Sequence, residues 1–165
     1  MQKLILFLPF LFLLVLSCGQ NKAKQGSTDD ISITVSETSS NEDEINNALT
    51  FINTYVENCS RGKEALNILD WINSNPLATD RLKTELKKMI DEANEQDPEL
   101  GLGFDPILDA QDYPDDGFEL DSFDKDTGYI TVKGIDWVGF KVTMKMIKEN
   151  DKFMVDGCGR VNISR

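Results

Sequence analysis

The chain has 165 residues, of which 17 are basic, 29 are acidic and none is histidine, and its formal net charge is −12 at pH 7. This charge argues against nucleic acid as a partner, because phosphate binding depends on clustered Lys and Arg. The absence of histidine excludes Ser-His-Asp and Cys-His catalysis and the usual His-bearing zinc sites. We interpret the acidity as a source of solubility, and the alternative is attraction to a basic partner.

The first 17 residues have the three parts of a secretory signal peptide. Lys3 supplies the positive charge, residues 4–16 form an unbroken apolar run, and Ser17 is a small residue before Cys18. The 13 apolar residues would rise about 20 Å as a helix, which is too short for the ~30 Å hydrocarbon core of a bilayer. An uncleaved transmembrane anchor is therefore disfavoured.

Residues 15–18, Val-Leu-Ser-Cys, resemble the lipobox of bacterial lipoproteins, in which the cysteine is acylated and becomes the new N-terminus. The resemblance implies a diacylglycerol and an N-acyl chain on Cys18. Several acyl chains hold a protein at a membrane permanently, since each buried methylene contributes ~0.8 kcal/mol. Gly19 follows the cysteine where the family has Asp for inner-membrane retention, which implies the outer membrane. We therefore expect a lipid-anchored protein of the bacterial cell envelope.

The rest of the chain divides into a tether and one folded domain. Residues 19–40 are rich in Ser, Thr, Gln, Asn and Gly and are interpreted as flexible, with an edge strand at 31–35 as the alternative. The remaining residues are enough for a single hydrophobic core. The predicted organisation is a signal peptide over 1–17, a lipidated cysteine and tether over 18–40, and a single α+β domain over 41–165.

Apolar residues at spacings of three and four predict helices in the first half of the domain. The first follows a variant capping box at Ser40 and Asp43, and Phe51 lies off its apolar stripe. The second is expected to turn Leu66 inward, and the third has Thr79 as its N-cap. The predicted limits are Ser40 and Arg61 for the first helix, Lys63 and Ser74 for the second, and Thr79 and Asp97 for the third.

After residue 117 the apolar period changes from 3.6 to 2, which is typical of strands packed on one face. Turns are expected at 126–128 and 150–151, and the last strand is expected to run on through Val161 and Ile163. Helices followed by antiparallel strands indicate the α+β class. The prediction is N-terminal helices packed on a curved antiparallel sheet of about four strands.

Cys59 and Cys158 are a candidate disulfide, because an exported protein matures in an oxidising compartment and an even pair remains besides Cys18. Such a bridge would close a loop of about 100 residues and stabilise the fold by at most ~4–5 kcal/mol. The sequence does not show whether the two cysteines come within bonding distance. A nucleophilic cysteine is disfavoured because the chain has no histidine to activate it.

Residues 105–114, DPILDAQDYP, are similar to a signature of a family of small bacterial lipoproteins of unknown function. The order of helices and strands resembles the cystatin-like and nuclear transport factor 2-like cone folds. This resemblance covers about residues 45–163. It implies a fold and a cell-envelope location, and it implies no activity, cofactor or metal.

The same segment concentrates carboxylates, and three interpretations of them stay open. The first is structural, because Asp side chains cap turns and Asp-Pro and Tyr-Pro stiffen a connection. The second is a ligand pocket in which one desolvated Asp has a raised pKa and acts as a base. The third is a calcium site, although Pro114 falls where an alternate ligand would be needed. We favour the structural one. The candidate residues are Asp105, Asp109, Gln111, Asp112 and Tyr113, with Asp115 and Asp116 beside them.

Trp137 lies between Gly134 and Gly139 and is expected at the tip or edge of a hairpin. Partial burial against a helix is favoured over a binding role at an interface, and Trp71 is expected in the core. The predicted function is a membrane-anchored, non-catalytic binding or interaction module. One alternative is a small-molecule-binding or isomerase-like enzyme that uses an Asp base in the cone, and another is an acidic inhibitor of a basic extracytoplasmic enzyme.

Overall fold

The structure is a computed structural model that describes residues 29–164. The predicted signal peptide, Cys18 and the residues that lead from it to Asp29 lie outside this part. Within residues 29–164, no helix is both long enough and apolar enough to cross a membrane.

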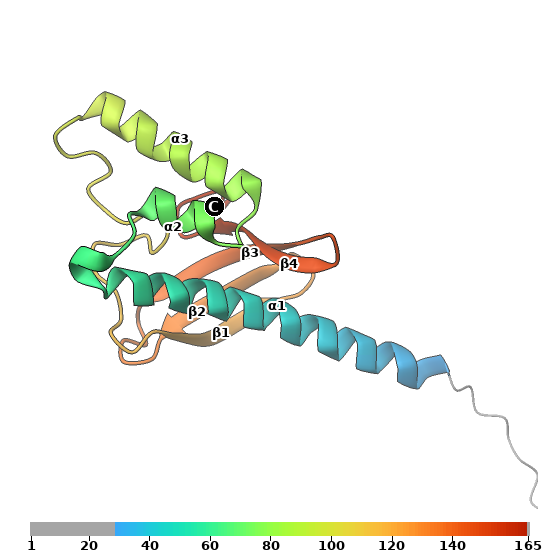
Figure 1. The fold of residues 1–165 in the computed structure, drawn as a ribbon. Helices are drawn as coiled ribbons and strands as arrows, with labels where there is room; N and C mark the ends of the chain where they lie inside the picture. Colours follow the sequence, from blue (N-terminus) through green and yellow to red (C-terminus); the bar gives the residue numbers. More distant parts are fainter. Residues whose placement is uncertain (1–28, 165) are drawn as a thin grey trace, which may run out of the picture.

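The described chain consists of helices followed by a sheet, which confirms the α+β class (Figure 1). The elements are α1 (Asp29–Cys59), the short 3-10 helix η1 (Gly62–Glu64), α2 (Ile68–Ser74), α3 (Asp80–Gln96), β1 (Phe118–Asp124), β2 (Tyr129–Gly134), β3 (Lys141–Glu149) and β4 (Lys152–Cys158). The strands form one antiparallel sheet in the order β1-β2-β3-β4. Helix α1 crosses one face of this sheet, and α3 lies on the β4 side together with α2 (Figure 1).

Helix α1 begins at Asp29, well before the predicted start at Ser40. Residues 29–40 are therefore helical rather than a flexible tether or an edge strand, and the predicted capping box lies inside the helix. The segment has no apolar stripe to reveal a helix. Extending a helix that is already nucleated is far less costly than starting one, so the buried part of α1 can carry polar residues with it.

Phe51 is fully buried, which corrects its predicted position off the apolar stripe. Its ring packs edge-on against Trp71 of α2, with 5.2 Å between the ring centroids. Trp71 is 7% exposed and belongs to the core, as predicted. Helix α1 thus buries a wider face than one stripe, because the sheet covers one side of that face and α2 covers another.

The second helix is shorter than predicted and begins at Ile68, after an N-cap at Asn67. Residues 62–64 form the separate helix η1. Leu66, predicted to point inward, is 49% exposed. Its backbone amide and carbonyl are both held by the Asn58 side chain at 3.0 and 2.9 Å, so Leu66 lies in a connecting loop instead of a helix.

Thr79 is the N-cap of α3, as predicted, and its hydroxyl accepts a hydrogen bond from the Leu82 amide at 3.0 Å. The segment just before α3 also covers the outer edge of β4. The Thr79 amide donates to the Val155 carbonyl at 3.0 Å, and the Val155 amide donates to the Leu77 carbonyl at 2.8 Å. The middle of this edge, at Val155, is therefore covered by the chain itself.

The alternation predicted for β3 is confirmed, because Val142, Met144 and Met146 are buried while the residues between them are more exposed. The last strand does not run on to Ile163 as predicted. It ends at Cys158, and the backbone then turns at Gly159, which has a φ of 60°, to close a Cys158–Val161 bridge. A left-handed residue of this kind ends a strand that sequence alternation alone would extend.

Candidate functional site

The motif segment forms a closed loop at one end of the sheet. Asp105 and Ala110 exchange two backbone hydrogen bonds of 2.8 and 3.3 Å. Between them, Ile107 and Leu108 are 0% and 2% exposed and belong to the core. The Arg160 amide donates to the Pro106 carbonyl at 2.9 Å, which joins the loop to the segment after β4. Because apolar residues at its centre are buried, this loop packs on the core and closes it at this end.

Asp105 is the half-buried carboxylate at the start of this loop. Its Oδ1 accepts the amides of Ile107 at 2.8 Å and Leu108 at 3.0 Å, and its Oδ2 accepts the Tyr55 hydroxyl from α1. Burial raises the pKa of the Asp105 carboxyl, although these hydrogen bonds act in the opposite direction. The pKa of Tyr55 is also raised, first by burial and then by the charge of Asp105. Oδ1 therefore holds the backbone of the loop itself, and Oδ2 fixes the loop to α1.

The two cysteines of the candidate disulfide are free thiols in the structure. Cys158 is fully buried and its Sγ donates to the Ile107 carbonyl at 3.4 Å, while Cys59 is half-buried at the end of α1. Burial, and next the charge of Asp105, raises the pKa of both thiols. Raised thiol pKa values disfavour the thiolate, so neither side chain has the character of a nucleophile.

The other candidate residues of the motif hold the loop or its neighbours. Asp109 has a φ of 56° and pairs with Arg160, with 3.4 Å between Oδ1 and Nε. The Gln111 side-chain amide donates to the Gly103 carbonyl at 2.8 Å, and Asp112 Oδ1 accepts the Tyr113 amide at 2.9 Å. Across residues 29–164, no three Cys, Asp or Glu side chains gather closely enough to hold a metal ion, so the calcium interpretation finds no site in that range.

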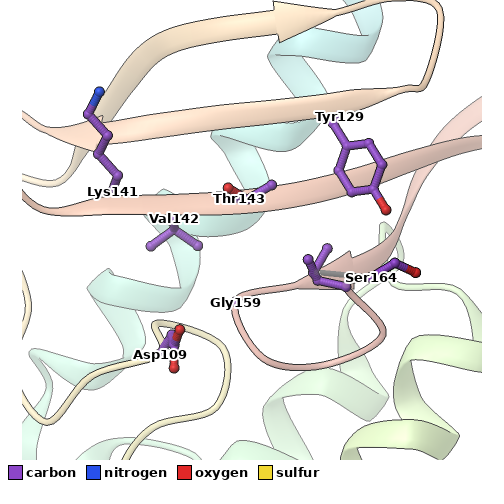
Figure 2. Close-up of a pocket in the computed structure, with 8 residues that line it drawn as sticks. Asp109, Tyr129, Lys141, Val142, Thr143, Gly159 and Ser164 are labelled. Carbon is purple, nitrogen blue, oxygen red and sulfur yellow. The ribbon is translucent and has the colours of Figure 1, made fainter.

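Two cavities lie beside the motif loop. One has a volume of about 350 Å³ and is lined by Ile68, Ile90 and residues 100–106, so Asp105 forms part of its wall. The other has a volume of about 420 Å³ and lies between the start of β3 and the C-terminal segment, as Figure 2 shows. The side chains and backbone that line this second cavity include those of Asp109, Tyr129, Lys141, Val142, Thr143 and Gly159.

The connection between β2 and β3 exposes three large apolar side chains within four residues. Ile135 is 50% exposed, Trp137 48% and Val138 59%, and we call these three residues the apex. The Trp137 ring packs against Phe140 with 5.1 Å between centroids, and Phe140 packs against Phe118 at 5.8 Å. Trp137 therefore lies in a hairpin connection as predicted, but it rests on an aromatic neighbour of its own hairpin instead of a helix.

The backbone of the apex is held in place by the segment before β1. The Asp136 carboxylate accepts the amides of Asp115 at 3.1 Å and Asp116 at 3.2 Å, and the Ile135 amide donates to the Gly117 carbonyl at 3.0 Å. Desolvation acts to raise the pKa of Asp136, but the amides of Asp116, Asp136 and Asp115 outweigh it and the pKa is lowered. No sequence pattern indicates this clamp, because it joins residues about 20 positions apart.

The apex lies at the end of the domain that is distant from Asp29. Asn53, in the C-terminal half of α1, bonds the amide and carbonyl of Phe118 at 2.7 and 3.0 Å, next to the apex. Glu44, nearer to Asp29, instead faces Gly128 in the turn at the opposite end of the sheet. In Figure 1 the Asp29 end of α1 extends away from the sheet.

Searches for related proteins find no matching family model, curated protein or solved structure.

Proposed function

We propose that the chain is a lipid-anchored module of the bacterial cell envelope, attached through Cys18 to the outer membrane, and that it binds a protein partner through the apex without catalysing a reaction. The observation that carries this proposal is the exposure of Ile135, Trp137 and Val138 on a clamped backbone. Isolated surface apolar residues are ordinary, but a contiguous cluster around a tryptophan is typical of interaction sites. A clamped backbone also lowers the entropy lost on binding.

Charge supports a basic partner. Asp115, Asp116 and Asp136 border the apex, and the whole chain carries a formal charge of −12. Acidic groups around an apolar centre steer a positively charged surface into contact and add specificity. A basic extracytoplasmic enzyme that is inhibited on binding would offer both a positively charged surface and a contact for the apolar centre. The proposal therefore includes the role of an acidic inhibitor of such an enzyme.

For the fold, we infer a cone of the cystatin-like or nuclear transport factor 2-like kind, with α1 in the role of the helix that crosses a bent antiparallel sheet. The strand order β1-β2-β3-β4 and the bulges at Asp121 of β1 and Asp156 of β4 support this inference. Bulges increase local twist and bend a strand, and a cone needs such bends.

A small-molecule or isomerase-like function with an Asp base is the second candidate, and the cavity of about 350 Å³ beside Asp105 favours it. A base needs a lone pair directed at its substrate. Asp105 instead accepts two amides and the Tyr55 hydroxyl. For this reason we place the interaction module first.

Photo-cross-linking in the native envelope tests the proposal. A photoreactive amino acid at Val138 should give a discrete adduct that disappears when Trp137→Ser is added. The same amino acid at Lys125, which is exposed in the β1–β2 turn at the opposite end of the sheet, is the matched control and should give no such adduct. An adduct at Val138 that survives Trp137→Ser, or no adduct at all, contradicts the proposal.

A further inference from the structure

Strand β3 has a short stretch that is paired on one side only. Its pairing with β2 covers Lys141 to Lys145, whereas its pairing with β4 begins only at Met144. Beyond that point the Gly159 amide donates to the Thr143 carbonyl at 3.0 Å, and the chain then turns away. The first residues of β3 therefore lack a neighbouring strand on the side where β4 would otherwise continue.

The register shows which backbone groups face this gap. The Gly134 amide donates to the Phe140 carbonyl at 3.0 Å, so even-numbered residues of this stretch direct their backbone groups to β2. Successive residues alternate in an antiparallel ladder, which turns the backbone of Lys141 and Thr143 to the other side. Among the described residues, the Thr143 amide has no backbone partner there. The gap thus presents two amides and the Lys141 carbonyl.

The cavity of about 420 Å³ lies along this stretch, since Lys141, Val142 and Thr143 all line it (Figure 2). Three residues of strand span about 10 Å. The charges at the cavity are already compensated, because Lys141 pairs with Asp121 at 2.6 Å and Arg160 pairs with Asp109 at 3.4 Å. Because the charged side chains at the cavity are already paired, a ligand that suits the cavity carries no charge and is recognised through its main chain.

We propose that this cavity binds an extended, uncharged peptide segment of about three residues, whose main chain pairs with the free edge of β3. The peptide residue opposite Lys141 would accept from the Lys141 amide and donate to the Lys141 carbonyl, and its neighbour would lie beside Gly159, which keeps the position opposite Thr143.

The long outer edge of β1 is a poorer candidate for the same chemistry. It carries Glu119, Asp121 and Asp124, and a bulge interrupts its register between Leu120 and Ser122. Charges and bulges of this kind block the addition of another strand. The edge of β3 has no bulge at positions 141–143, and its one charged side chain, Lys141, is held by Asp121, which makes it the site where a strand can add.

The test uses the full lipidated protein in detergent micelles, labelled with nitrogen-15 at threonine so that the Thr143 amide is observed by NMR. The probe is the neutral peptide acetyl-Val-Thr-Val-amide, and titration should shift the Thr143 amide with saturation. The same peptide with its central nitrogen methylated keeps the side chains but cannot donate to Lys141. We expect the methylated peptide to bind about tenfold more weakly, because it loses this backbone hydrogen bond.

Two variants at one position separate the backbone from the side chain. Lys141→Pro removes the amide donor at the first residue of a strand, where proline is tolerated, and should weaken binding about tenfold. Lys141→Ala loses the side-chain ammonium, as Lys141→Pro does, but keeps the backbone amide. It should bind the peptide with an affinity within about twofold of that of the parent protein. Trp137→Ser should leave peptide affinity unchanged, so this site and the apex fail or succeed separately. An unshifted Thr143 amide, or equal binding of the methylated peptide, overturns the proposal.

Discussion

The Thr79 hydroxyl donates a hydrogen bond of 3.0 Å to the Asp156 carboxylate, which joins the N-cap of α3 to the end of β4 inside the protein. Asp156 is 1% exposed, and its second oxygen accepts the Asn162 side-chain amide at 3.1 Å. Asp156→Ala leaves the buried Thr79 hydroxyl without its acceptor, while the Asn162 side-chain amide keeps only the backbone carbonyl of residue 156 at 2.6 Å. We expect it to lower the free energy of unfolding by about 2–3 kcal/mol, measured as a lower midpoint in urea.

Asp80→Ala is the matched control for this prediction, because Asp80 is also an acid at the start of α3 but its side chain is fully exposed. It pairs with Lys83 at 3.7 Å on the surface. Its loss should change the free energy of unfolding by less than about 1 kcal/mol. Equal effects of the two substitutions would show that the buried contact of Asp156 is not the source of stability.

Glu44 should make the fold less stable as the pH rises towards neutrality. The side chain is 7% exposed on α1, and desolvation raises the pKa of its carboxyl above the usual value. The folded state therefore binds this proton more tightly than the unfolded state does. The associated stability is complete below the unfolded pKa of about 4.3 and is lost as the pH passes the folded pKa. Glu44→Gln should remove this loss and be more stable than the parent at pH 7.

The measurement is the free energy of unfolding in urea at several pH values from 4 to 7, for the parent and for Glu44→Gln. Glu42→Gln supplies a comparison, since Glu42 lies on the same helix but is exposed. It should follow the parent across the whole range. If Glu44→Gln also follows the parent, desolvation of Glu44 has no effect on stability.

Tyr55 and Asp105 provide the third stability test. Tyr55→Phe keeps the buried ring, which packs on Trp71 with 4.7 Å between centroids, and removes only the hydroxyl that donates to Asp105. A half-buried oxygen of the Asp105 carboxylate then loses its donor. We expect unfolding to become easier by about 1–3 kcal/mol, seen as a lower urea midpoint with an unchanged slope.

Tyr113→Phe removes the same group from a half-buried tyrosine of the motif and should have little effect on the urea midpoint, because no hydrogen bond of the Tyr113 hydroxyl is found among the described residues. If Tyr55→Phe leaves the urea midpoint unchanged, Asp105 keeps its loop in place without its bond to α1. That result would also reopen Asp105 as a group available to a ligand in the cavity beside it.

The features that the sequence could predict depend on contacts between near neighbours in the chain. Alternation in β3, the N-cap at Thr79 and the order of helices and strands each follow from spacings of two to four residues. The errors occur where a distant segment intervenes. Phe51 is buried because α2 covers it, and the last strand stops at Gly159 because the backbone turns there towards the motif loop.

The sequence by itself determined the acidic charge, the lack of histidine chemistry and an α+β fold with Trp137 in a hairpin connection. Only the tertiary structure decided that Asp105 is committed to Tyr55 and that Asp136 clamps the apex. It also decided that β3 keeps a free edge beside a cavity. The physical reason is that burial and hydrogen-bond partners are set by segments far apart in the chain, whereas periodicity and capping are set within a few residues.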